Sequence, residues 1–78
     1  MNTKEYILTK LVETHDSYLS GEILADELGV TRAAVWKAIR ELASDGIEIE
    51  ALRNQGYRLT DAARVRGMNL LLGAERVS

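Results

Sequence analysis

The sequence predicts a mainly α-helical domain with one small β-hairpin, which is an α+β fold. Apolar residues recur with a helical period in three segments between Thr3 and Ser44, and a residue suited to an N-cap precedes each segment. From Ile47 the apolar period shortens to that of a β-strand. Because the chain has only 78 residues, we expect its helices and hairpin to share a single core.

Composition excludes several classes of protein. The absence of cysteine excludes a disulfide framework and a thiolate zinc site. No apolar run reaches the roughly 18 residues of a membrane span, and residues 1–5 do not resemble a signal peptide. We therefore expect a cytoplasmic protein with no membrane partner. His15 is the single histidine, and with Asp16 and Ser17 it makes neither a metal site nor a triad, so we expect no metal, no cofactor and no enzymatic activity.

Charge is distributed unevenly along the chain. The formal net charge is −2, and acidic residues outnumber lysines in residues 1–30. By contrast, residues 31–40 contain Arg32, Lys37 and Arg40 and no acidic residue. A local basic patch of this kind is the electrostatic signature of a surface that binds nucleic acid.

The first helix is expected at about Thr3 to Glu13. Asn2 can cap it, and Glu5 three residues later completes a capping box. One apolar stripe is formed by Ile7, Leu8, Leu11 and Val12. His15-Asp16-Ser17 is expected to end the helix.

Two further helices follow a very short strand expected at Tyr18-Leu19. Ser20 is a suitable N-cap for the second helix, and Gly29 is a suitable left-handed residue at its C-terminal end. Thr31 can cap the third helix, which is expected at Arg32 to Ser44 and ends at Asp45-Gly46.

The third helix has two different faces. The inner face contains Val35, Ala38, Ile39 and Leu42, and the outer face contains Ala33, Lys37, Arg40 and Ser44. Arg32 and Trp36 flank the outer face. For Trp36, packing under the hairpin and contacting a ligand are equally compatible with the sequence.

Residues 47–59 are expected to form the hairpin. Ile47, Ile49 and Ala51 alternate with Glu48, Glu50 and Leu52, and Tyr57 and Leu59 alternate with Arg58. Arg53-Asn54-Gln55-Gly56 is the expected four-residue tip.

The C-terminal residues are less regular. Helical spacing is approached by Val65, Met68, Leu71 and Leu72, but Gly67 and Gly73 weaken the pattern. We therefore expect one domain in residues 1–60, followed by a tail in residues 61–78 that is a short helix or a linker.

The order of these elements predicts a winged helix-turn-helix with a three-helix core and the hairpin as its wing. Two short helices joined by a tight turn that contains glycine, the second with a basic outer face, are what this motif requires. Ala25 is small enough for the helices to cross closely, and Val30 and Val35 fill the space between them. We expect residues 32–44 to be the recognition helix in the major groove of double-stranded DNA, and residues 47–59 to touch its backbone or minor groove.

Eight residues are predicted to bind DNA: Thr31, Arg32, Ala33, Trp36, Lys37, Arg40, Arg53 and Arg58. Arg32, in the first turn of the recognition helix, can bond guanine with two hydrogen bonds. Thr31 and the free N–H groups at the helix start can hold a phosphate. The acidic residues Glu22, Asp26 and Glu27 are expected to face solvent away from DNA.

The segment Ser20 to Leu42, including Thr-Arg-Ala-Ala-Val-Trp-Lys, resembles the N-terminal DNA-binding domain of the biotin operon repressor and biotin–protein ligase family. Gly56-Tyr57-Arg58-Leu59 resembles the end of that family's wing, and the resemblance covers about Ile7 to Leu59. It implies a repressor module that binds operator DNA. The family's ligase domain has a Gly/Arg-rich loop, of which Arg64-Val65-Arg66-Gly67 is a poor echo. Biotin binding, ligase activity and dimerisation through that domain are therefore not carried over.

Three functions remain open on these observations. The first is sequence-specific DNA binding as a transcriptional regulator, for which a homodimer on DNA is a compatible arrangement. The second is a winged helix that binds a protein partner through its acidic helices. The third is a DNA-binding fragment of a bifunctional biotin–protein ligase, so that the parent protein is an enzyme although this segment is not.

Overall fold

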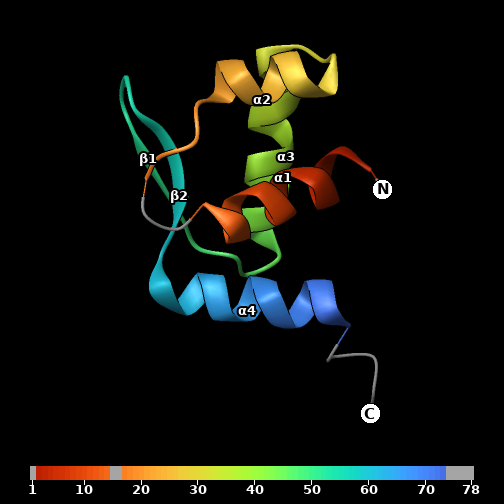
Figure 1. Cartoon of the computed structure of the whole chain (residues 1–78), viewed down its shortest axis with the longest axis vertical. Helices are drawn as coiled ribbons and strands as arrows, with labels where there is room; N and C mark the ends of the chain where they lie inside the picture. The colour runs from red at the N-terminus through yellow and green to blue at the C-terminus, as the bar shows by residue number, and fades with distance from the viewer. Residues whose placement is uncertain (1, 15–16, 74–78) are drawn as a thin grey trace.

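The computed structural model describes residues 2–14 and 17–73. His15 and Asp16, which are expected to end the first helix, lie outside the described residues. The elements are α1 (Thr3–Glu13), α2 (Gly21–Leu28), α3 (Arg32–Ser44), β1 (Ile49–Leu52), β2 (Gly56–Leu59) and α4 (Asp61–Leu72) (Figure 1). Within this part of the chain, no helix is long and apolar enough to cross a membrane.

Side-chain caps fix where the helices begin. The Asn2 side chain accepts a hydrogen bond from the Glu5 N–H, and the Glu5 carboxylate accepts one from the Asn2 N–H, which is the predicted capping box. Hydroxyl N-caps begin the other three helices: Ser20 for α2, Thr31 for α3 and Thr60 for α4. Each such cap contributes about 1 kcal/mol to helix stability. The three caps predicted from sequence, Asn2, Ser20 and Thr31, are therefore confirmed.

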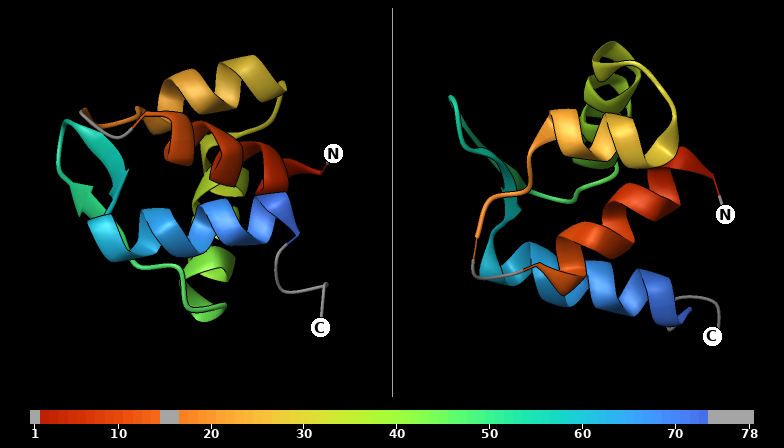
Figure 2. Two further views of the ribbon diagram at one scale, coloured as in Figure 1. Left: turned by 60° about the horizontal axis from the view of Figure 1, so that its bottom comes forward. Right: turned by 45° about the horizontal axis from the view of Figure 1, so that its top comes forward.

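The core lies where α1, α2 and α3 meet, and α4 covers it at the bottom of the view in Figure 1. Figure 2 shows α1 between α2 and α4, with α3 crossing behind it. The buried apolar residues are Ile7, Leu8, Leu11, Leu24, Ala25, Val35, Ala38, Ile39, Leu42, Ile47, Leu59 and Ala63. The predicted inner face of α3 is confirmed. No polar or charged side chain of the described residues is buried, so their charges lie at the surface.

The turn between α2 and α3 is set by a left-handed residue. Gly29 has φ 68° and ψ 34°, and its N–H donates to carbonyl groups of the last turn of α2. The Val30 N–H then donates to the Ala25 carbonyl over 3.0 Å, and the Val30 side chain packs against the core. This is the predicted turn, and it directs the chain into α3 after only a few residues.

The wing (residues 47–59) is an antiparallel hairpin in which Ile49 pairs with Leu59, and Leu52 with Gly56. The connecting turn has three residues, Arg53 to Gln55, with Asn54 at φ 68°. The prediction of a four-residue tip is therefore wrong, because Gly56 is paired in β2. The expected alternation is lost toward the tip, where Glu50, Ala51 and Leu52 are all exposed.

A backbone contact joins the wing to the segment before α2. Leu19 and Tyr57 exchange two hydrogen bonds, of 2.7 and 2.9 Å, so Leu19 adds a one-residue strand beside β2. A Cβ atom on Gly56 would overlap the carbonyl group of Leu19. Glycine is thus required where the wing meets this segment.

Residues 61–72 form a complete helix that packs against α1. The Arg64 guanidinium donates to the Val12 carbonyl over 3.2 Å, and Gly67 lies directly against Leu8 and Val12. Of the apolar residues that suggested helical spacing, Leu71 packs on the core, whereas Val65, Met68 and Leu72 are exposed. The buried side of α4 is built instead from small residues, which let the two helices approach closely. The division of the chain at residue 60 stays a prediction.

Two glycine substitutions should separate conformational strain from steric overlap. Gly29→Ala places a Cβ at positive φ with no atom within 4 Å, so we expect a loss of about 1–2 kcal/mol in the free energy of unfolding. Gly56→Ala, at φ 123°, adds the overlap with Leu19 and should cost clearly more. Urea denaturation followed by far-ultraviolet circular dichroism measures both values. Equal losses would show that the Leu19 contact does not constrain Gly56.

Candidate nucleic-acid interface

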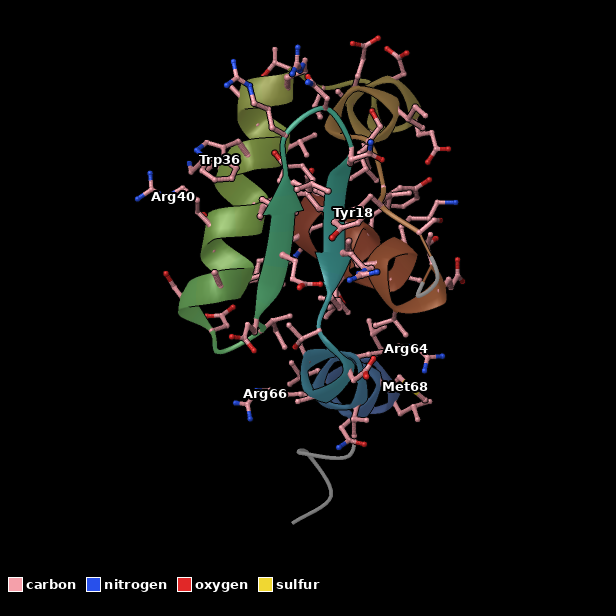
Figure 3. All side chains as sticks on the ribbon, turned by 90° about the vertical axis from the view of Figure 1, so that its left-hand side faces the viewer. Tyr18, Trp36, Arg40, Arg64, Arg66 and Met68 are labelled. Atoms are coloured by element: carbon pink, nitrogen blue, oxygen red, sulfur yellow. The ribbon has the colours of Figure 1, made fainter. Side chains whose placement is uncertain are left out.

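The outer face of α3 gathers most of the predicted binding residues on one surface. Six of the eight predicted residues are exposed on it: Thr31, Arg32, Ala33, Trp36, Lys37 and Arg40. Figure 3 shows Arg40 projecting from α3 away from the body of the molecule. The Thr31 hydroxyl accepts a hydrogen bond from the Ala34 N–H, which leaves its own hydrogen available to a ligand oxygen.

A cleft separates this face from the wing. It is lined by residues 20–22 at the start of α2, by Arg32, Ala33 and Trp36 of α3, and by residues 51–57 of the wing. We call it the wing cleft. Arg53, at the wing tip, lies in its lining together with Arg32. The structure thus brings Arg32, Ala33 and Trp36 of α3 and Arg53 of the wing tip to the two sides of one open groove, whereas Lys37 and Arg40 lie outside it.

Trp36 stacks on Tyr57, and both residues line this cleft. Their ring centroids lie 6.2 Å apart, with an angle of 26° between the ring planes. Trp36 nevertheless keeps 48% of its surface exposed. The two roles that the sequence left open for Trp36 are therefore compatible, since one part of the side chain packs against the wing and another faces solvent.

Arg58 lies on the opposite face of the wing. Its guanidinium donates to the Glu50 carboxylate over 2.9 and 3.2 Å, and it stands 4.7 Å from the centre of the Tyr18 ring. The hydrogen bonds to Glu50 raise the pKa of Arg58 above its usual value. Successive residues of a strand point to opposite faces, so Arg58 points away from the side on which Tyr57 meets Trp36. The structure does not bring Arg58 into the wing cleft.

Comparison with known proteins identifies the family to which the chain belongs. The family described as "HTH domain", for helix-turn-helix, matches residues 3–58, which is more than half of the chain. The chain belongs to the HTH domain family. The HTH domain is thus the DNA-binding module of a transcriptional regulator. The four helices and the two-stranded hairpin of the described residues, together with this family match, confirm the predicted winged helix-turn-helix fold.

Two curated relatives match the HTH domain over its first part. "Bifunctional ligase/repressor BirA" of Bacillus subtilis (strain 168) is 50% identical over 44 residues, which are 56% of this chain and 14% of that protein. The protein of the same name from Bacillus spizizenii is 52% identical over 42 residues, which are 54% of this chain and 13% of that protein. The resemblance stated from the sequence is confirmed, and the matched segment is a small part of each relative.

The acidic residues of α2 do not share one environment in the HTH domain. Glu22 lines the wing cleft, which corrects the expectation that it faces away from the binding surface. Glu27 accepts a hydrogen bond from the Tyr6 hydroxyl over 3.0 Å and lies 3.9 Å from the Lys10 ammonium, so it joins α2 to α1. That hydrogen bond raises the pKa of Tyr6. Asp26 is exposed and does not line the cleft.

A basic residue that sequence reasoning missed lies beside the C-terminal half of α3. Lys4 lines a shallow groove with Lys37 and Arg40, and its ammonium lies 2.6 Å from the Asp45 carboxylate. The hydrogen bond to Asp45 raises the pKa of Lys4. Lys4 lies off the apolar stripe of α1, but no local pattern predicts that the start of α1 reaches the end of α3.

The chemistry of this surface is that of anion binding. The guanidinium groups of Arg32 and Arg53 and the exposed indole of Trp36 line the wing cleft, and Lys37 and Arg40 line the neighbouring shallow groove. Among residues 2–14 and 17–73, no cluster of three or more His, Cys, Asp or Glu side chains could hold a metal ion. His15 lies outside these residues.

Removal of the Glu22 charge should tighten DNA binding and weaken the fold. Glu22→Gln removes an anion from the wing cleft, and this should make the free energy of duplex binding more favourable by about 0.2–1 kcal/mol. Because Glu22 is in the first turn of α2, the same change should lower the free energy of unfolding by about 0.3–1 kcal/mol.

Asp26→Asn is the matched control, because it changes the net charge equally outside the cleft. Fluorescence anisotropy on a labelled duplex measures affinity, and urea denaturation measures stability. An equal gain in affinity for both variants would assign the effect to net charge and not to the position of Glu22.

Proposed function

We propose that this domain binds double-stranded operator DNA as a repressor module, with α3 in the major groove and the wing on the backbone or minor groove. One observation carries the proposal: Arg32 of α3 and Arg53 of the wing tip stand on the two sides of the wing cleft, and Lys37 and Arg40 continue the exposed basic face along the same helix. The names of both relatives, which include the word repressor, support the direction of regulation.

The recognition helix has suitable dimensions and side chains for the major groove. Its 13 residues extend for about 20 Å, and a major groove about 12 Å wide admits one helix. Arg32 in the first turn reaches base edges, and the small Ala33 permits close approach. Lys37 and Arg40 follow on the outer face and contact base edges or phosphates. Thr31 donates its hydroxyl hydrogen to a phosphate at the helix start.

The wing supplies the second contact. Its turn, residues 53–55, extends beyond the core, and Arg53 is exposed there. An arginine at such a tip suits a phosphate or the narrow minor groove. Arg58 contributes less in this arrangement, because Glu50 already compensates its charge.

Two copies of the domain on a palindromic operator complete the proposal. A single small domain of net charge −2 covers one half-site, and a homodimer would place two half-sites about one helical turn of DNA apart. We place the domain in the cytoplasm, since its proposed ligand is operator DNA. The domain itself takes no part in catalysis.

A second candidate concerns the parent protein. Both relatives are named as bifunctional ligase and repressor, and the matched segment covers 14% and 13% of them. This favours a larger protein in which the present domain supplies DNA binding. The gene sequence downstream of Ser78 tests it: an open reading frame that continues into a ligase domain supports the candidate, and a stop codon contradicts it.

Binding should depend strongly on salt. If three to five phosphates are neutralised, the plot of log K against log salt concentration should have a slope of about −3 to −4. Anisotropy titrations of the domain on a duplex, selected by the domain from a random pool, measure the slope between about 50 and 200 mM salt. A flat plot would contradict DNA binding through the cations of α3.

Arg32 should carry sequence preference. Arg32→Ala should weaken binding to the selected duplex by about 1–3 kcal/mol and affect a scrambled duplex much less. Arg66→Ala is the matched control, because it removes the same charge from α4, and Arg66 lines neither the wing cleft nor the shallow groove. An equal loss on both duplexes would identify Arg32 as a phosphate contact.

A further inference from the structure

We propose that Tyr57 is a positioning residue that fixes the wing relative to the recognition helix, acting through Trp36. The contacts of α3 and of Arg53 with DNA are then coupled, because one aromatic stack holds the two elements at a set angle. This proposal rests on the proposed DNA-binding function and assigns a role to a residue outside the eight predicted contacts.

Tyr57 is held from three directions. Its backbone N–H and carbonyl both bond to Leu19, over 2.9 and 2.7 Å. Its ring stacks on Trp36, with 6.2 Å between centroids. The ring also lies against Gly21, where an added Cβ would be 3.2 Å from the ring carbon Cε2. Tyr57 therefore joins β2, the start of α2 and the outer face of α3 at one point.

The wing needs such a contact because its outer part has little support from the core. Along β1 only Ile49 is half-buried, and Glu50, Ala51 and Leu52 are exposed. An isolated two-stranded hairpin is at best marginally stable in water. Tyr57 pairs with Ala51 and directly follows Gly56, so its stack lies close to the turn that carries Arg53.

Trp36 connects this contact to the predicted DNA-binding residues of α3. Arg32, Trp36 and Arg40 succeed one another at intervals of four residues and therefore lie along one side of the helix. Trp36 lines both the wing cleft and the shallow groove next to Arg40. A rotation of the wing about its base would thus alter the separation of Arg53 from the arginines of α3.

The competing explanation is that Tyr57 only stabilises the fold. Tyr57 is half-buried and packs against the core cluster, so a loss of stability alone could lower binding. The two explanations differ in one respect. A positioning role makes the contribution of Arg53 depend on the Tyr57 ring, whereas a purely structural role leaves that contribution unchanged in the molecules that remain folded.

The experiment is a cycle of Tyr57→Leu and Arg53→Ala, with Tyr57→Phe as the variant that keeps the ring. Aromatic pairs are worth about 0.5–1.5 kcal/mol, so Tyr57→Leu should weaken binding to the selected duplex roughly 2- to 12-fold. In the wild type and in Tyr57→Phe, Arg53→Ala should reduce the magnitude of the salt slope by about 0.9. In Tyr57→Leu it should produce no further reduction. An undiminished effect of Arg53→Ala in Tyr57→Leu overturns the proposal.

Trp36 supplies a direct reading of the stack, because it is the single tryptophan of the chain. Its fluorescence and near-ultraviolet circular dichroism in the absence of DNA should change in Tyr57→Leu and be retained in Tyr57→Phe. Unchanged spectra in a folded Tyr57→Leu variant would show that the stack does not exist in solution, and would also overturn the proposal.

Gly21→Ala keeps the test valid if Tyr57→Leu does not fold. The added Cβ presses on the Tyr57 ring, whereas alanine is a better helix former than glycine and should not destabilise α2. Altered Trp36 spectra together with a smaller Arg53 contribution support the proposal, and wild-type values of both contradict it. If the wild-type domain shows no salt-dependent binding to duplex DNA, the proposed function itself is contradicted. That result is distinct from both outcomes of the Gly21→Ala test.

Discussion

The arrangement of the whole binding surface depends on the backbone pairing of Leu19 with Tyr57. These two hydrogen bonds attach the wing to the segment that begins α2, and they bring Gly56 so close to Leu19 that a side chain cannot be accommodated. Since α2 and α3 are in turn fixed by the left-handed turn at Gly29, the wing is held relative to the recognition helix. A marginal hairpin thereby becomes one wall of a defined cleft.

The second organising feature is the separation of α3 into an apolar and a basic side. Val35 and Ile39 belong to the core and hold the helix in place, whereas the cations point outward without any buried charge among the described residues. The acidic residues are arranged unequally around this basic face. Lys10 compensates the charge of Glu27 and Arg58 that of Glu50, whereas Glu22 remains in the cleft, where it opposes an anionic ligand. Local arrangement, and not the net charge of −2, therefore determines what the surface attracts.

Local interactions explain why much of the fold could be predicted from the sequence. A cap involves residues two or three positions apart, and the inner face of α3 follows from one helical period, so both are visible in the sequence itself. The remaining features depend on packing between distant segments. The Trp36–Tyr57 stack and the place of Glu22 in the cleft depend on the angle between the wing and the helices. The absence of Arg58 from the cleft depends on the register of the hairpin. The side of α4 that faces α1 is the side that contains Gly67, because only a small residue fits against α1 there. The spacing of apolar residues alone did not indicate this side.

Arg53 and Gln55 of the wing turn and the exposed cations on the outer side of α3 share a property beyond their accessibility: none of them contributes a side chain to the core. Substitutions at such sites usually change stability by no more than about 0.5 kcal/mol. The surface that selects a ligand can therefore diverge between related proteins while the scaffold is conserved by its packing. In evolutionary terms, a family built on this domain can acquire new target sequences through a few exposed changes, without a stabilising mutation elsewhere to compensate for them.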